Sequence, residues 1–141
     1  MKLKFFLALG IIILGVGVFG YFKAISVPED RENLPKIEVS PKDYNFGNIN
    51  YGDAVNYTFL VKNAGVSLLE IKRVATSCAC TTAKISKEVI EPGDAAELEV
   101  TYNSGQMTGS HGRGPQERII FVKSSDPITP QAQVIIYGNV N

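Results

Sequence analysis

Apolar residues follow two patterns along the chain, a continuous run near the N-terminus and then a period of two. The run FFLALGIIILGVGVFGYF, residues 5–22, contains no charged residue. From Lys36 onward, apolar side chains alternate with polar ones in short stretches. Because successive side chains of a strand point to opposite faces, this alternation predicts strands with one buried face.

Turn signals separate the alternating stretches. Gly, Pro, Asn and Asp cluster at residues 51–53, 63–65, 91–94 and 125–127, where they favour turns. The predicted strands are 37–39, 44–49, 55–62, 69–74 (with a bulge or change of face at 73–74), 81–85, 97–102, 116–124 and 133–137. Residues 86–90 suit a helical turn. About seven short strands in roughly 100 residues predict an all-β, immunoglobulin-like antiparallel β-sandwich.

The N-terminal run predicts a membrane helix. Its 18 residues span roughly 27 Å as a helix, close to the ~30 Å hydrocarbon core of a bilayer. Lys2 and Lys4 precede it and favour a cytoplasmic N-terminus with the rest of the chain outside. We therefore expect an anchor or signal peptide at 1–23, a polar linker at 24–35 and the sandwich at 36–141. Cleavage of the leader would instead give a secreted or periplasmic protein.

The formal net charge of zero hides an uneven distribution. From residue 24 onward there are 11 basic and 14 acidic residues, a net charge of −3. A mildly acidic domain without a basic stripe argues against nucleic-acid binding. The expected partners are the membrane, through residues 5–22, and a protein or peptide in the cell envelope.

The sequences of the predicted strands and turns resemble those of a known family, the bacterial domain-of-unknown-function family 1573. The matching segments are KIEV (36–39), YNFG (44–47), FLVKNAG (59–65), LEI (69–71), SCACT (77–81), IEPG (90–93) and SSDP (124–127). Ala79 stands where the family more usually has glycine. The resemblance covers about 36–141 and implies export, a β-sandwich similar to those of centrosomal proteins and nematode major sperm protein, and a role in binding. It implies no catalytic residues.

The only two cysteines, Cys78 and Cys80, are the main candidates for chemistry. If they lie on a strand, their thiols point to the same face. They could then be half-buried structural thiols, a local disulfide or two ligands of a copper(I) or zinc site. Extended residues two apart place their α-carbons about 6.5–7 Å from each other, so a disulfide would need a bend in the chain and would be easily reduced.

A glycine-rich segment, residues 104–115, holds the other candidate residues. Met107 and His111, the only histidine, could complete a metal site with the cysteines if this loop folds over them. A loop of this length is also a reasonable binding surface. Its expected polar contacts are Arg113 and an exposed Gln116.

No motif predicts an enzyme, because no Ser-His-Asp unit, phosphate-binding loop or carboxylate pair has the required context. The sequence therefore favours a non-catalytic binding or scaffold module of the bacterial envelope. The alternative is a thiol-based metal-binding or redox accessory protein that uses Cys78 and Cys80.

Overall fold

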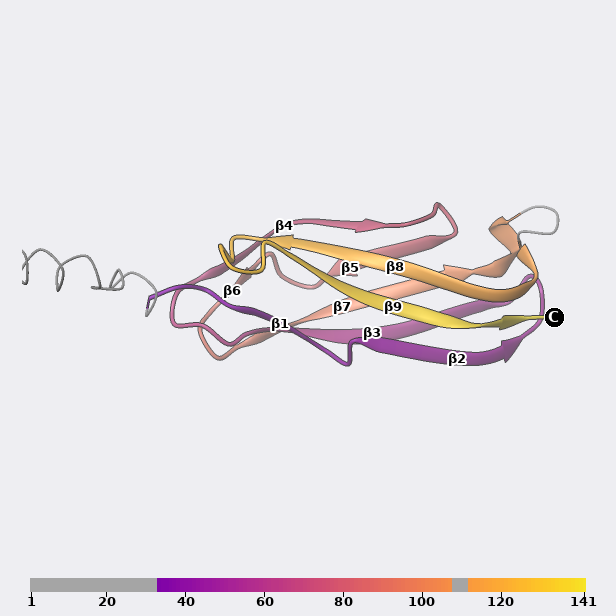
Figure 1. Cartoon of the computed structure of the whole chain (residues 1–141), viewed down its shortest axis with the longest axis horizontal. Helices are drawn as coiled ribbons and strands as arrows, with labels where there is room; N and C mark the ends of the chain where they lie inside the picture. Colours follow the sequence, from indigo (N-terminus) through magenta and orange to yellow (C-terminus); the bar gives the residue numbers. More distant parts are fainter. Residues whose placement is uncertain (1–32, 108–111) are drawn as a thin grey trace, which may run out of the picture. The chain divides into compact units, whose positions relative to one another are not determined.

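A computed structural model describes residues 33–107 and 112–141 and contains nine strands there, most of them where the sequence alternates (Figure 1). The strands are β1 (Ile37–Ser40), β2 (Asp43–Ile49), β3 (Ala54–Asn63), β4 (Leu69–Thr76), β5 (Thr81–Ile85), β6 (Val89–Ile90), β7 (Ala95–Asn103), β8 (Gly114–Ser124) and β9 (Gln131–Val140). A short 3₁₀ turn, η2 (Ser104–Gln106), follows β7.

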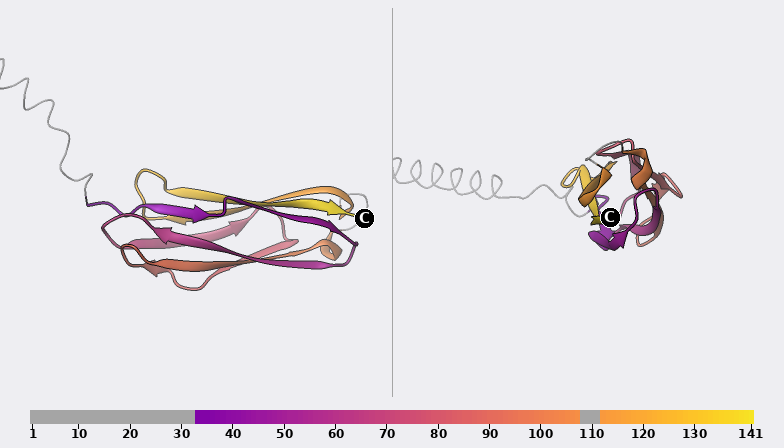
Figure 2. Two further views of the ribbon diagram at one scale, coloured as in Figure 1. Left: turned by 90° about the horizontal axis from the view of Figure 1, so that it is seen from below. Right: turned by 90° about the vertical axis from the view of Figure 1, so that its right-hand side faces the viewer.

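The strands make two sheets that face each other. One has the order β1-β3-β7-β5 and the other β2-β9-β8-β4-β6, and the view along the strands shows them arranged around a common interior (Figure 2). The core takes its side chains from both sheets, including Phe59 and Leu98 from one and Ile120 and Val134 from the other. These four side chains are fully buried, so burial of apolar surface between the sheets drives the stacking.

One pairing departs from the predicted antiparallel arrangement. β1 lies in the first sheet beside β3, and the chain then passes to the second sheet, where β2 runs parallel to β9. The change of sheet occurs at residues 41–42, directly after the Ser40–Pro41 peptide bond. The chain does not reverse direction between β1 and β2, and as a result β2 runs parallel to β9.

The described residues confirm an all-β fold with two sheets and correct two details. Residues 89–90 pair with β4 as the short strand β6 instead of forming a helical turn, because Ile90 is buried in the core. The irregularity predicted at 73–74 is a register shift between Ile71 and Arg73.

The expected anchor, residues 5–22, and most of the expected linker lie outside the described residues. Within those described residues, no helix has the length and apolar character needed to cross a bilayer.

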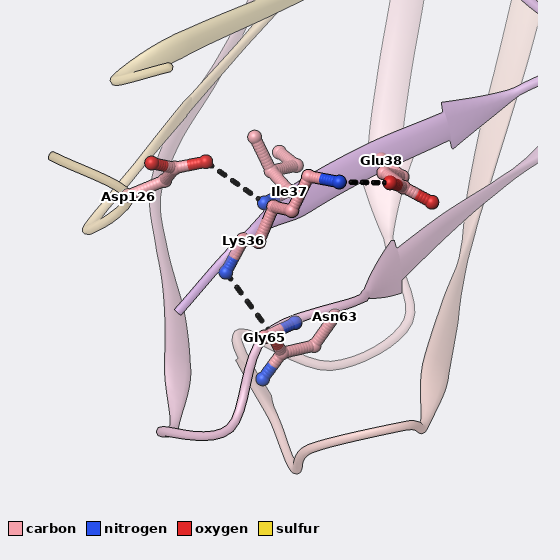
Figure 3. Close-up of polar contacts among 6 residues, drawn as sticks. All are labelled: Lys36, Ile37, Glu38, Asn63, Gly65 and Asp126. Atoms are coloured by element: carbon pink, nitrogen blue, oxygen red, sulfur yellow. Dashed lines mark hydrogen bonds and ion pairs between the residues drawn. The ribbon is translucent and has the colours of Figure 1, made fainter. Parts of the chain in front are cut away.

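Asn63 connects the start of β1 to the rest of the domain. Its Oδ1 accepts hydrogen bonds from the backbone amides of Lys36 and Gly65, at 3.3 and 3.0 Å (Figure 3). Its Nδ2 donates to the carbonyls of Ser67 and Ile90. The side chain is fully buried. These four bonds use both N–H donors of its amide nitrogen and both acceptor positions of its amide oxygen. Gly65 has no room for a β-carbon, because the backbone of residues 34–36 occupies that space.

Asp126, in the β8–β9 loop, holds β1 from the other side. One carboxylate oxygen accepts the backbone amide of Ile37 at 3.0 Å (Figure 3), and the other accepts those of Ile128 and Thr129 at 2.8 and 2.9 Å. Burial of the carboxyl raises its pKa, but these three hydrogen bonds outweigh burial and leave the pKa of Asp126 below its ordinary value.

We predict that Asp126→Ala lowers the free energy of unfolding by about 2–4 kcal/mol, because it leaves three backbone amides without their acceptor. Urea unfolding at pH 7 would measure this loss. Since folding lowers this pKa, the contribution is complete above the ordinary value of 3.8 and is lost as the pH falls below it. Asp43→Ala, at an exposed position of β2, is the control and should cost under about 0.5 kcal/mol. Equal losses for the two variants would contradict this role.

Candidate functional site

The two cysteines lie in the turn between β4 and β5. The amide of Thr81 donates to the carbonyl of Cys78 at 3.3 Å, which closes a four-residue turn. Ser77 fixes the turn to β8, because its amide donates to the carbonyl of Ile119 and its hydroxyl accepts the amide of Ile119. The pair therefore lies between two strands and not on an extended strand, since β4 ends at Thr76 and β5 begins at Thr81.

The turn brings the two sulfur atoms together as a disulfide. The α-carbons of Cys78 and Cys80 are 5.3 Å apart, within the range that a disulfide requires and shorter than an extended chain allows. Of the three alternatives that the sequence left open, the structure thus contains the local disulfide, and the bend it needs is present.

The two ends of this disulfide have different surroundings. Cys80 is 3% exposed and belongs to the core, whereas Cys78 is only half-buried. Cys78 lines an open surface pocket of about 550 Å³ that Met107, Arg113 and Arg118 also line. A molecule in solution can therefore reach Cys78 far more easily than Cys80.

Arg118, on β8, points its guanidinium at the buried end. Its Nε donates to Cys80 Sγ at 3.0 Å. The other two nitrogens donate to the carbonyl of Glu117 and to Oε1 of Gln116, which orients the group. No carboxylate pairs with Arg118 among the residues that the structure describes. A half-buried positive charge therefore faces a disulfide sulfur without a counter-ion of its own.

Tyr102, on β7, completes the buried side of the site. The Arg118 guanidinium carbon lies 5.5 Å from the centre of its ring, a distance that permits a cation–π contact. The hydroxyl is buried and has no hydrogen-bond partner within the described part of the chain. Burial raises the pKa of Tyr102, and the positive charge of Arg118 opposes that change in part.

The structure tests the placement of the predicted metal ligands only in part. Cys78 and Met107 line the same pocket, with Cys80 bonded to Cys78. His111 lies outside the described residues. Residues 33–107 and 112–141 contain no cluster of three or more His, Cys, Asp or Glu side chains suited to a metal. Thiolate ligands would require the disulfide to be reduced first, so the copper(I) or zinc site stays a prediction.

The two predicted binding residues have different positions. Arg113 is exposed, donates to the terminal carbonyl of Asn141, and lies 4.7 Å from the centre of the Tyr51 ring. Gln116 is buried, contrary to the expectation, because it lies on the inward face of β8 and accepts the hydrogen bond from Arg118. Their role in binding stays a prediction.

Sequence reasoning missed Arg118 and Tyr102. Arg118 lies 38 positions from Cys80, and no local pattern marks a contact at that separation. The strand pairings bring them together, since β7 carries Tyr102 beside Thr81 and β8 pairs with β4.

Two facing sheets, between which the chain crosses after β1, define an all-β class of fold, and comparisons with known proteins specify the family. A family model described as a protein of unknown function, DUF1573, matches residues 37–140. The chain therefore belongs to the DUF1573 family, as the sequence resemblance predicted. No curated protein sequence matches it.

Solved structures with similar folds share little sequence identity with the chain. A protein of unknown function from Porphyromonas gingivalis W83 is 19% identical with a TM-score of 0.68 over 81% of this chain, which spans about half (51%) of that structure. A PapD-like domain of human CEP192 is 13% identical, with a TM-score of 0.59 over 83% of this chain and 93% of that domain. SSP-19 of Caenorhabditis elegans, described as an MSP-domain protein like family member, is 12% identical with a TM-score of 0.50, over 72% of this chain and 97% of that chain. At these identities the likeness concerns the fold alone.

The metal hypothesis predicts that the reduced protein takes up copper(I) or zinc with one-to-one stoichiometry in equilibrium dialysis, because reduction frees two thiolates. His111→Ala and Met107→Leu should each weaken binding about tenfold or more if these residues complete the site. The disulfide form is the matched control and should bind neither metal. Absence of stoichiometric uptake by the reduced chain would remove the metal hypothesis.

Proposed function

We propose that the chain is a non-catalytic binding module of the bacterial envelope, an immunoglobulin-like sandwich tethered by residues 5–22, that takes an extended segment of a partner protein onto a free strand edge. Membership of a family of unknown function and the PapD-like and MSP-like folds of its neighbours are consistent with a binding role. The observation that carries the proposal is a groove with unpaired backbone on both walls.

The groove lies between β1 of one sheet and the start of β9 of the other. Its volume is about 560 Å³, and its lining includes Ile37, Val39, Gln131, Ala132 and Gln133. β2 pairs with β9 only from Ile135 onward, so residues 131–134 have β8 on one side and the groove on the other. The walls are therefore a strand edge from each sheet.

The wall from β1 exposes backbone groups at odd-numbered positions. The carbonyl of Lys36 accepts the amide of Ala64, at the end of β3. Since alternate residues of a strand direct their backbone groups to opposite sides, Lys36 and Glu38 face β3. Ile37 and Val39 face the groove, and Asp126 already occupies the Ile37 amide. The amide and carbonyl of Val39 are then available to a partner.

The wall from β9 has the same alternation. The amide of Ser124 donates to the carbonyl of Pro130, so even-numbered positions face β8, while the amide of Ile135 donates to the carbonyl of Lys42 on the other side. The amide and carbonyl of Gln133 therefore face the groove. An extended peptide placed there could continue either sheet, with apolar contacts to Ile37, Val39 and Ala132.

Such pairing is the usual hazard of exposed edges, and it becomes a function when the edge is concave and selective. β5 also has one free side, because it pairs only with β7. Its odd-numbered residues face outward, since Ser86 and Cys80 direct their backbone groups to β7. β5 thus provides a matched comparison within the same molecule.

We predict that Val39→Pro and Gln133→Pro each abolish capture of the partner, because proline removes the one amide at each position that faces the groove. The measurement is quantitative co-purification with the tagged full chain from detergent-solubilised envelope. Ala83→Pro, which removes an outward amide from β5, should capture the same protein as the wild type.

Thermal unfolding of each variant would separate loss of capture from loss of folding. If only Ala83→Pro lost the partner, the binding site would be the edge of β5 and not the groove. An unchanged set of captured proteins in all three folded variants would contradict strand pairing at the groove.

We also predict that a reporter fused after Asn141 is active outside the cytoplasm and remains with the membrane fraction, because residues 5–22 are long enough to span a bilayer and follow two lysines. Fusions of alkaline phosphatase and of green fluorescent protein, which work on opposite sides of the membrane, would measure this. Replacing two apolar residues of 5–22 by aspartate should retain the reporter inside the cell. Fluorescence of the unaltered green fusion would contradict the placement.

A further inference from the structure

We infer that the Cys78–Cys80 disulfide is a thiol-exchange site, in which an incoming thiolate attacks Cys78 and Arg118 stabilises Cys80 as the leaving thiolate. The inference goes beyond the proposed binding role, since it concerns the β4–β5 turn and not the groove. It rests on the unequal exposure of the two sulfurs, on the direction of the Arg118 charge and on the shortness of the loop that the disulfide closes.

Access selects the sulfur that is attacked. Cys78 lines the open pocket at the β4–β5 turn, while Cys80 is 3% exposed. Exchange requires the attacking thiolate, the central sulfur and the leaving sulfur to lie in line, so the accessible sulfur becomes the central one. Arg113 and Arg118 also line the pocket against one acidic residue, Glu117, and this charge balance favours an anionic thiolate.

Charge selects the leaving sulfur. The Nε of Arg118 already donates to Cys80 Sγ at 3.0 Å, and two other acceptors fix the orientation of the guanidinium. A disulfide sulfur is a weak acceptor, whereas a thiolate beside arginine makes a charge-assisted hydrogen bond. Reduction therefore gives Arg118 the counter-ion that it lacks among the described residues. A more stable thiolate is a better leaving group and makes the disulfide a stronger oxidant.

A purely structural role explains this disulfide poorly. The bond joins residues with a sequence separation of 2. A cross-link restricts the unfolded chain more when it closes a longer loop, so this one constrains the chain very little. The turn is also held without it, by the Cys78–Thr81 hydrogen bond and by the two bonds between Ser77 and Ile119.

The chemistry balances with a thiol substrate as the co-reactant. A substrate thiolate bonds to Cys78 Sγ, the Cys78–Cys80 bond breaks, and its electron pair stays on Cys80 Sγ beside Arg118. A second substrate thiolate then attacks the substrate sulfur of this mixed disulfide and releases Cys78 as a thiolate. Overall, two substrate thiols are oxidised to one disulfide, and the protein disulfide is reduced to two thiols. The substrate class is a pair of cysteine thiols on an exported protein or peptide.

The test uses the full chain in detergent, equilibrated with glutathione buffers of varied ratio and then alkylated for mass measurement. We expect Arg118→Gln to shift the equilibrium about 10- to 100-fold toward the protein disulfide, because one charge-assisted hydrogen bond to the thiolate is lost. Arg118→Lys should recover part of the shift, since it keeps the charge. Arg73→Gln, at an exposed position of β4, is the matched control and should stay within about twofold of the wild type.

Two single-cysteine variants test which sulfur is attacked. With oxidised glutathione as the probe, Cys80→Ser should form a mixed disulfide through Cys78 at least tenfold faster than Cys78→Ser does through Cys80, because a thiol this well buried reacts slowly. Circular dichroism of each variant confirms that the fold is kept.

Equal rates for the two variants, or a glutathione equilibrium that Arg118→Gln leaves at the Arg73→Gln value, would overturn the assignment. So would a disulfide that glutathione does not reduce at any ratio. Val39→Pro and Gln133→Pro should leave the equilibrium unchanged, because neither residue lines the pocket beside Cys78. The binding proposal and this one can thus fail independently.

Discussion

Two buried polar side chains, Asn63 and Asp126, fix where β1 begins, and the groove beside β1 depends on that position. They accept the amides of Lys36 and Ile37 from opposite sides. These two hydrogen bonds determine which backbone groups of β1 form hydrogen bonds with β3 and which face outward. Had Asp126 not taken the Ile37 amide, the edge would be open over its whole length, and open edges associate without selectivity. The carboxylate closes one end of the groove and leaves the Val39 groups available.

The alternation of apolar and polar residues predicted most of the strands because each sheet has one dry face. β3 and β7 follow this rule almost without exception, with Phe59 and Leu98 inward and Leu60 and Glu97 outward. β6 escaped prediction because two residues carry no periodicity. The parallel pairing of β2 escaped as well, because direction depends on where the chain crosses between sheets, and the alternation is the same in both directions.

The candidate site was predictable in its sulfur atoms and unpredictable in its surroundings. The spacing of Cys78 and Cys80 already required a bend for a disulfide, and the turn supplies it. The sequence did not reveal that Arg118 faces Cys80 or that Gln116 turns inward to hold Arg118. Both facts follow from the register of β8 against its neighbours, which is set by the whole sheet. Residues that act on a site through tertiary contacts have no local signature.

The disulfide and the groove lie at opposite ends of the sheets, since the β4–β5 turn and the start of β1 are at different ends of the strands (Figure 1). A partner segment in the groove would pair with backbone at Val39 and Gln133 and would make no contact with the pocket beside Cys78. The groove would recognise the extended backbone of a partner, whereas the disulfide would react with a partner's thiol. A partner recognised by both would need an extended stretch and a cysteine separated by the length of the strands, which is a geometric condition on its identity.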